Sequence, residues 1–453
     1  STMYEYIPKG VAFLLKKLLL ALLCVAMVFA MCGCDFFTTD IAELLSPPSL
    51  SGDLKQIQNA ISQSAGRNYK FEYPQTGEYH SAVVQKDVNG DKKNEAFAFY
   101  STFNDDVETM SINVVCKNED GWKSFDEQSI VASGVHRVDF CDLDRDGISE
   151  ILVGWQIYGA SEMQLAVYSF KDNVLTQRML TRYNHFVTCN LNGNKADEIL
   201  VVDMDTKNSR NTASLYELEP NGVVQIGRCE LDSKVQTIGH PIVEELSSGK
   251  SAVYIDSVKG IGAITEVLVY QKGKLLNPLF DDQAKETSLT LRSASFEVVD
   301  FNNDGILEIP VQLNVPSVSK SEVAEKLYLT NWCSFNGEIL TTQVTSMINV
   351  LDGYYYNLPA KWVGKIAILK DTDNRIREIY SYDTEEMKVG DSLIYFRAIS
   401  KKDWGNGIYA PLNMIKVGET EETVIACRLS KTAKESGVTI EKIIEDLGLF
   451  TQE

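Results

Sequence analysis

Short runs of apolar and β-branched residues recur along the chain between turns rich in Asp, Asn and Gly. Between residues 135 and 180 the runs VHRVDFC, EILVGWQI, EMQLAVYSF and NVLTQRML follow one another with short polar breaks. Runs of this length and composition, bounded by turn residues, are typical of β-strands. The pattern therefore predicts four strands in this stretch, joined by turns.

The acidic segment DLDRDGISE, residues 142–150, joins the first two runs and has counterparts elsewhere. Aligned segments begin at residues 87, 142, 190, 244 and 300; the one at 244 keeps the glycine and the following apolar run but not the acidic ninth place. A repeat of about 50 residues with four strands each is typical of a β-propeller, in which each blade is buried only against its neighbours. We therefore expect a mainly β fold, a β-propeller of four-stranded blades with five readable repeats.

The two ends of the chain lack this repeat. DLKQIQNAISQSA, from Asp53, has apolar residues at helical spacing and predicts a leading helix. After about residue 346 the period is lost, and TIEKIIEDLGLF predicts another helix with apolar residues, Leu447 among them, on one face. We expect the propeller and its helix over 53–345 and a small α+β domain over 346–453. Alternatively, part of the last segment forms a further blade, with DTDNRIRE at Asp371 as its loop.

The first residues have the pattern of an export signal. Three lysines precede the apolar run LLLALLCVAMVFAM, which has about the length of a signal-peptide core and is short for a membrane span. The run ends in MCGC, and a small residue directly before a cysteine resembles a bacterial lipoprotein signal. The resemblance implies a signal peptide over 1–33, lipidation of Cys34 and a tether over 34–52. The alternative is an uncleaved anchor that adds residues 11–15. Both place most of the chain outside the cytoplasm, attached to a bacterial membrane.

The net charge of the chain argues against one class of partner, nucleic acids. Lys and Arg number 43 against 63 Asp and Glu, which gives a formal net charge of −20. Such a surface repels phosphate backbones, so we expect no nucleic-acid partner. Six cysteines follow residue 34 without a CxxC pair, in strand-like apolar runs. They are expected to be free buried thiols, although an extracellular location also permits disulfides.

The acidic loops offer side-chain oxygens at their first, third, fifth and ninth places. Calcium takes six to eight hard oxygen ligands, and such a turn supplies most of them. Over about residues 81–345 the loops and their strands resemble the FG-GAP, or VCBS, repeats of integrin-like propellers. The resemblance implies three structural calcium sites. Their expected ligands are Asp87, Asn89, Asp91 and Glu95; Asp142, Asp144, Asp146, the carbonyl of Ile148, and Glu150; and Asp300, Asn302, Asp304 and Glu308.

The loops are not expected to bind calcium equally. The loop at 142 has four acidic ligands and should bind best, because clustered carboxylates repel one another unless a cation neutralises them. The loop at 244 lacks the needed oxygens, and the loop at 190 has one acidic ligand, Glu198. The loop at 87 has Lys92 where a glycine would ease the turn. The alternative is that Asp and Asn in these loops only close turns.

Motifs for catalysis are missing from the sequence, which contains no GxSxG, HExxH or GxGxxG. Its four histidines lie on strands that approach the loops, where the repeat explains their recurrence. We therefore expect a membrane-tethered lipoprotein whose calcium-braced propeller binds a protein or a glycan. The alternatives are an extracellular hydrolase with a carboxylate pair in the propeller funnel, or an activity carried by the C-terminal domain.

Overall fold

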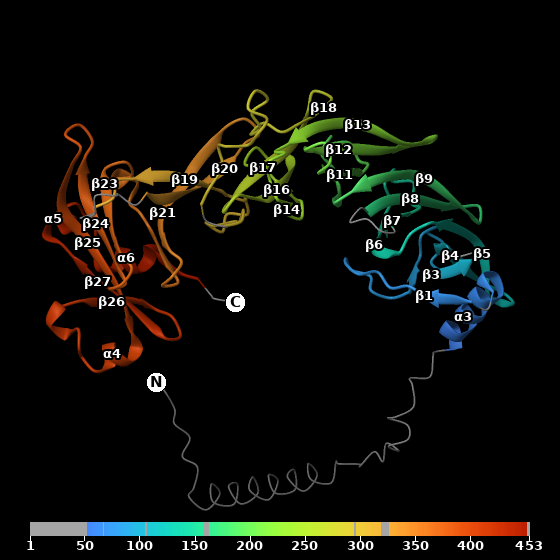
Figure 1. Cartoon of the computed structure of the whole chain (residues 1–453), viewed down its shortest axis with the longest axis horizontal. Coiled ribbons are helices and arrows are strands. Elements are labelled where there is room, and N and C mark those ends of the chain that lie inside the picture. Colours follow the sequence, from blue (N-terminus) through green and yellow to red (C-terminus); the bar gives the residue numbers. More distant parts are fainter. Residues whose placement is uncertain are drawn as a thin grey trace, which may run out of the picture. The chain divides into compact units, whose positions relative to one another are not determined.

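The computed structural model describes residues 52–66, 68–104, 107–157, 163–293, 296–318 and 326–450, and these are mainly β. The helix predicted from Asp53 is present as α3 (Gly52–Ala65). Six antiparallel sheets then follow one another in chain order (Figure 1). The proposed signal peptide and the tether up to residue 51, with Cys34, lie outside the described residues, and the last tether residue, Gly52, begins α3. Among the residues that are described, no helix is long and apolar enough to cross a bilayer.

Strands that are consecutive in the chain are neighbours in most of the sheets. The first sheet contains β1 (Tyr69–Phe71), β2 (Val83–Lys86), β3 (Glu95–Asn104), β4 (Val107–Asn118) and β5 (Gly121–Ile130). The second contains β6 (Gly134–Cys141), β7 (Glu150–Gln156), β8 (Met163–Lys171) and β9 (Val174–Tyr183). The third contains β10 (His185–Cys189), β11 (Glu198–Asp205), β12 (Arg210–Glu219) and β13 (Gly222–Leu231). The second and third sheets match the predicted four-strand pattern, and the first has β1 paired to β3 as an additional strand.

The fourth and fifth sheets depart slightly from this pattern. The fourth contains β14 (Thr237–Ile238), β15 (Ile242–Glu245), β16 (Ser251–Lys259), β17 (Gly262–Gln271) and β18 (Lys274–Leu276), with β14 and β15 both paired to β16. The fifth contains β19 (Ile309–Val315), β20 (Leu327–Phe335), β21 (Leu340–Asn349), β22 (Tyr354–Asn357) and β28 (Leu447–Leu449). The last strand comes from the end of the chain.

The repeat is visible in a shared irregularity of the sheets. The pairing register shifts between the two outermost strands of the sequence repeat at Val114/Val115, Val167/Tyr168, Leu215/Tyr216 and Trp332/Cys333. A shift of this kind bends the bulged strand and increases its twist. Its recurrence at one place in four sheets shows that the sequence repeat is also a structural repeat.

The hydrophobic core lies between consecutive sheets. One cluster joins Phe97 of the first sheet to Val153 of the second, and another joins Leu200 of the third to Val253 of the fourth. Further clusters join the second sheet to the third, the fourth to the fifth and the fifth to the sixth. Each sheet is therefore buried against its neighbours in the chain, as expected for a repeat array.

The C-terminal segment contributes to two sheets. The predicted boundary at residue 346 falls inside β21, and β22 and β28 pair within the fifth sheet. The sixth sheet contains β23 (Ile366–Asp371), β24 (Ile376–Asp383), β25 (Lys388–Ser400), β26 (Ile415–Glu419) and β27 (Thr423–Leu429). The short helices are η1 (Ala360–Trp362), α4 (Lys401–Gly405), η2 (Ala410–Leu412), α5 (Lys431–Glu435) and α6 (Ile440–Asp446).

The last predicted helix is shorter than its apolar pattern suggested. Leu447, expected on the helical face, has extended backbone angles and begins β28, where it is opposite Tyr356. Pairing with β22 satisfies backbone groups of residues 447–449 that a longer helix would have satisfied internally. Tertiary context therefore ends α6 at Asp446.

Candidate metal-binding loops

The acidic loops occupy equivalent positions in their sheets. Residues 87–95 join β2 to β3, residues 142–150 join β6 to β7, and residues 190–198 join β10 to β11. Residues 300–308 precede β19 and are closed by a pair of backbone hydrogen bonds between Val299 and Glu308, at 3.2 and 2.8 Å. The loops at 87, 142 and 190 thus connect the first two strands of a repeat, as the sequence predicted, whereas the loop at 300 is preceded by an isolated bridge instead of a strand.

Three of the loops share one backbone conformation. The fourth and sixth places are left-handed in the loops at 87 (Gly90 and Lys92), 142 (Arg145 and Gly147) and 300 (Asn303 and Gly305), with φ between 60° and 88°. The loop at 190 has a left-handed residue at its fourth place only, Gly193. The loops predicted to bind calcium are therefore alike in geometry, and the doubtful loop differs from them.

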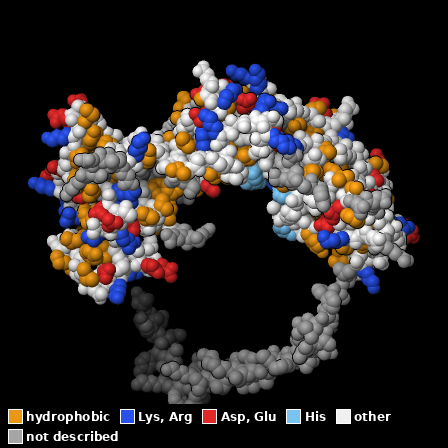
Figure 2. All heavy atoms as spheres, viewed as in Figure 1, with side chains coloured by type: hydrophobic (Ala, Val, Ile, Leu, Met, Phe, Trp, Pro, Cys, Tyr) orange, Lys and Arg blue, Asp and Glu red, His pale blue; other side chains and the backbone are white. Residues whose placement is uncertain are grey.

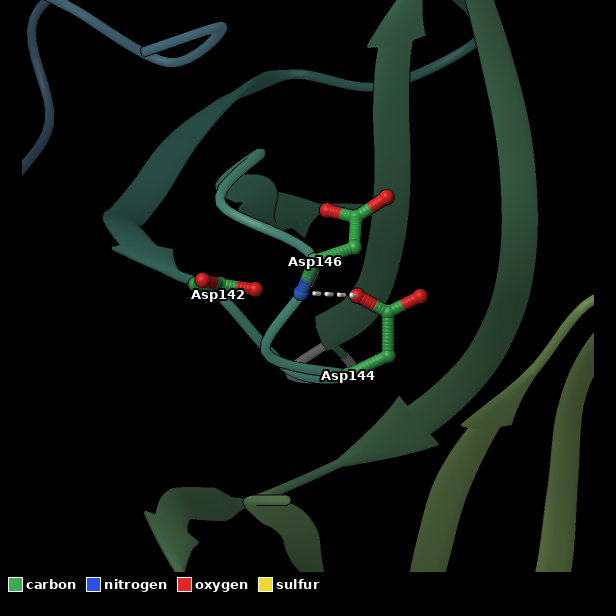
Figure 3. A group of neighbouring side chains, drawn as sticks. All are labelled: Asp142, Asp144 and Asp146. Carbon is green, nitrogen blue, oxygen red and sulfur yellow. Dashed lines mark hydrogen bonds between the residues drawn. The ribbon is translucent and has the colours of Figure 1, made fainter. Parts of the chain in front are cut away.

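The loop at 142 gathers three carboxylates. One oxygen from each of Asp142, Asp144 and Asp146 lies within 4.8 Å of the others. Asp144 accepts a hydrogen bond from the Asp146 N–H at 3.2 Å (Figure 3), and Asp146 accepts one from the Ile148 N–H at 2.8 Å. Asp142 accepts the Gly147 N–H at 3.0 Å through Oδ2. Its Oδ1 is shielded from solvent and has no hydrogen bond from any described residue.

The corresponding aspartates of the other two loops are fully engaged by backbone. Asp87 accepts the Gly90 N–H at 2.8 Å through Oδ1 and the Lys92 N–H at 2.9 Å through Oδ2. Asp300 accepts from Asp304 at 3.0 Å and from Gly305 at 2.9 Å in the same way. These bonds close turns, which is the alternative role considered for the side chains. Only at 142, among these three loops, does the first aspartate keep an oxygen without a donor.

The remaining predicted ligands in these two loops also form local hydrogen bonds. Oδ1 of Asn89 accepts from Asp91 at 2.9 Å, and Oδ1 of Asp91 accepts from Lys93 at 2.7 Å. Oδ1 of Asn302 accepts the Asp304 N–H at 2.9 Å, and its amide donates to Oδ2 of Asp304 at 3.0 Å. These side chains therefore shape their turns through hydrogen bonds within the loops.

The ninth-place glutamates have a structural role that the sequence analysis missed. In each loop one oxygen of the buried glutamate accepts the backbone N–H of the second residue; the pairs are Glu95 with Val88 (3.1 Å), Glu150 with Leu143 (3.1 Å), Glu198 with Leu191 (2.7 Å) and Glu308 with Phe301 (2.9 Å). Burial raises the pKa of all four, that of Glu150 to about 7. Their recurrence in the weakly acidic loop at 190 was the available sign of this role.

Neighbouring loops are joined directly to one another. The Ser149 N–H donates to the Val88 carbonyl at 2.7 Å, which links the loops at 87 and 142. The Asp197 N–H donates to the Leu143 carbonyl at 3.1 Å, and Arg145 forms an ion pair with Asp197 at 3.1 Å. These bonds link the loops at 142 and 190. The conformations of the loops at 87, 142 and 190 are therefore coupled.

The structure also locates the cysteines and histidines that the sequence analysis considered. All six cysteines beyond residue 34 are free thiols and none is exposed. Histidine side chains gather on one part of the surface (Figure 2), where the rings of His185 and His240 have centroids 6.0 Å apart. His136 shares a 2.7 Å hydrogen bond with the Tyr183 hydroxyl, and burial lowers the pKa of all three histidines. No metal cluster other than the three aspartates occurs in the described ranges.

The hydrolase alternative requires a carboxylate pair in a cavity, and one cavity, of about 640 Å³, has several acidic residues in its lining. Its lining includes Asp352 and three glutamates of residues 419–422. Asp352 is engaged by the Arg375 guanidinium at 2.6 Å and by the Asn349 amide at 2.8 Å. Glu419 is within 4 Å of Lys401 and Lys416. Asp352 and Glu419 thus form ion pairs with neighbouring cations.

Comparison with known proteins gives distant likenesses in structure. No family model matches the chain, and no curated protein matches it in sequence. Similar solved structures include the exotype rhamnogalacturonan lyase YesX (12% identity, TM-score 0.27, 72% of this chain and 66% of the lyase). They also include the Dos1 propeller (9%, TM-score 0.25, 69% and 78%) and an exo-β-1,3-galactanase from Phanerochaete chrysosporium (7%, TM-score 0.25, 73% and 81%). The match covers just under two thirds of the lyase, and likenesses at these TM-scores do not extend to function.

Proposed function

We propose that this chain is a calcium-braced β-propeller, tethered to the outside of a bacterial membrane, that binds a protein or a glycan. The observation that supports it most is the direct linkage of successive acidic loops. Because Ser149 bonds to Val88 and Asp197 bonds to Leu143, an ion that fixes one loop also restrains its neighbours. A rigid row of loops at equivalent positions suits a binding surface, since surface loops held by a rigid scaffold commonly carry binding residues.

Calcium would enter the loop at 142 through Asp142, Asp144 and Asp146, with the Ile148 carbonyl as a further ligand. The shielded Oδ1 of Asp142 needs a donor or a cation, because a buried charged oxygen without a partner is costly. Glu150 would complete the shell with Oε1, which accepts the Ser169 hydroxyl at 3.2 Å, while Oε2 stays on Leu143. When bound, the ion would supply charge neutralisation and stiffness, not catalysis.

The loops at 87 and 300 are proposed as weaker sites. Each has three acidic ligands, and the number of charged ligands tunes calcium affinity. An ion there would have to share Asp87 and Asp300 with the backbone N–H groups that they already accept. The loop at 190, with asparagines at its first, third and fifth places, is proposed to act only as a turn.

Attachment through Cys34 is a separate part of the proposal. Expression of the full chain in a bacterium should give a mature N-terminus at Cys34 carrying a lipid, seen by mass spectrometry. The Cys34→Ser variant should lose the lipid and leave the membrane fraction. A chain that keeps residues 1–33 and stays in the membrane after Cys34→Ser would instead support the uncleaved anchor.

The binding function is tested on arrays of glycans and purified surface proteins, with calcium and with chelator. We expect stable binding to a defined partner that weakens on chelation and in the Asp144→Asn variant. Asn at this position keeps the oxygen that accepts the Asp146 N–H and removes only the charge. Turnover of a glycan without stable binding would favour the hydrolase alternative, and absence of binding in both conditions would contradict the proposal.

A further inference from the structure

A cavity of about 420 Å³ lies where the fifth and sixth sheets meet. Its walls come from β19, β20 and β21 on one side and from β23 and β24 on the other. Backbone hydrogen bonds join the two sheets there: Val318 N–H to the Ile368 carbonyl at 2.8 Å, and Ile368 N–H to the Pro316 carbonyl at 2.9 Å (Figure 1 shows β19 beside β23). Much of the cavity is thus built on strands, which position side chains more precisely than loops.

Arg377 is one of two buried cations of this cavity; the other is Arg292. Arg377 lies on β24 with 6% of its surface exposed, directly opposite Lys370 of β23, and both side chains line the space. The next pair on the same face, Ile368 opposite Ile379, is apolar and belongs to the core. Arg377 thus lies at the edge of the apolar core, on the face of β24 that lines the cavity.

The Arg377 guanidinium has donors to spare. Among the described residues it makes one hydrogen bond, from Nη1 to the Ile376 carbonyl at 2.9 Å, and no ion pair. Arg292, which also lines the cavity, differs because it is 3.0 Å from Asp256 and donates to Thr265, Thr290 and Phe296. The planar fork of N–H groups of a guanidinium matches a carboxylate.

The rest of the lining is apolar, neutral polar or cationic. No aspartate or glutamate occurs among the lining residues that the structure describes, although the whole chain is acidic. Lys326 adds a further cation. Apolar side chains supply most of the wall, and Val350 and Leu351 are more than half exposed. The main apolar lining residues are Phe296, Pro310, Leu327, Tyr328, Met347 and Ile348.

We propose that this cavity binds a small carboxylic acid with an apolar body about the size of a six-membered ring, and that Arg377 holds the carboxylate. Pockets of 300 to 1,000 Å³ with apolar walls and a few fixed polar groups are typical of small-molecule sites. The site goes beyond the proposed function, because none of the acidic loop residues lines it and it requires no calcium.

The test is calorimetric titration of the full chain with cyclohexanecarboxylate and with its neutral match, cyclohexanecarboxamide. We expect the acid to bind about tenfold or more tightly than the amide, because hydrogen bonds between charged groups are the stronger ones. Arg377→Gln should weaken acid binding by about tenfold or more without affecting the amide. Titrations with calcium and with chelator should agree, so failure of the calcium proposal leaves this expectation unchanged.

A second variant avoids dependence on a buried substitution. Leu351→Glu introduces a negative charge at a lining position that is 67% exposed and should weaken the acid while circular dichroism stays unchanged. Ile339→Glu makes the same change at an exposed position, 62%, outside the cavity and should have no effect. Equal binding of acid and amide, binding of inorganic phosphate or D-galacturonate as tight as that of the apolar acid, or no binding at all would each overturn the proposal.

Discussion

Glu266 should make the stability of this protein fall as pH rises. Its side chain, on β17, is fully buried. Oε1 accepts hydrogen bonds from the Asp232 N–H at 3.1 Å, the Asn277 amide at 2.7 Å and the Thr287 hydroxyl at 3.0 Å. Oε2 has no partner among the described residues. Burial outweighs these bonds and raises the pKa of Glu266 from 4.5 to about 7.

The direction in which stability changes with pH follows from which state, folded or unfolded, holds the proton on Glu266. Between pH 4.5 and 7 the folded protein holds a proton on Glu266 that the unfolded chain has largely released. The stability associated with this proton is fully present below pH 4.5 and is lost as pH rises through 7. The rise of the pKa from 4.5 to about 7 corresponds to about 3 kcal/mol, because a tenfold change in proton affinity is worth about 1.36 kcal/mol. Glu266→Gln, which stays neutral, should not show this loss.

The assay is urea unfolding of wild type and Glu266→Gln at pH 4.5 and pH 8. The free energy of unfolding of the variant, relative to wild type, should rise by about 3 kcal/mol between the two pH values. Glu230→Gln is the control, because the hydrogen bond from Lys285 lowers the pKa of Glu230, so its pH dependence lies mainly below pH 4.5 and this variant should show no such rise between pH 4.5 and pH 8. A difference between wild type and Glu266→Gln that does not change with pH would refute the reasoning.

Three further changes test other parts of the structure. Lys92→Gly should stabilise the chain by about 0.5 to 1 kcal/mol in thermal unfolding, because Lys92 has a φ of 68°, a left-handed conformation that glycine adopts without strain. An unchanged or lower stability would show that Lys92 is not strained. Lys259→Met should cost on the order of 3 kcal/mol, since it leaves Asp232, 2.7 Å away and buried, without its cation; a loss below 1 kcal/mol in urea would contradict this. Burial raises the pKa of all six described thiols, that of Cys141 to about 11, so iodoacetamide at pH 8 should label them slowly until urea is added, and rapid native labelling would contradict their burial.

Patterns within short segments of the sequence predicted the strands, the turns and the clustered aspartates, because these depend on residues that are close together in the chain. Strand runs and turn residues located the four-stranded repeats, and the spacing of Asp142, Asp144 and Asp146 indicated that their carboxylates would meet. Gly147 was readable as a left-handed position because glycine tolerates it. Arg145, left-handed at the fourth place, carried no such sign in its residue type.

Long-range pairing accounts for what could not be predicted. The pairing of β28 with β22 joins residues about ninety apart, and nothing local to Leu447 indicates a partner. The same holds for the cavity at Arg377, whose walls come from separate parts of the chain. The sequence analysis also missed the hydrogen bonds that the ninth-place glutamates accept from the backbone N–H of the second loop residue. The sequence alone does not distinguish a glutamate that binds a metal from one that holds the loop backbone. The glutamates are Glu95, Glu150, Glu198 and Glu308.

Calcium binding by the loop at 142 is the central claim, and calorimetric titration of the chelator-treated full chain tests it most directly. Asp144→Asn removes one ligand charge, and Asp120→Asn removes a charge from an exposed turn elsewhere. The account predicts that wild type and Asp120→Asn bind calcium alike and that Asp144→Asn loses the tightest site. Absence of calcium binding in wild type, or identical binding in all three proteins, would contradict it and leave the aspartates as turn formers.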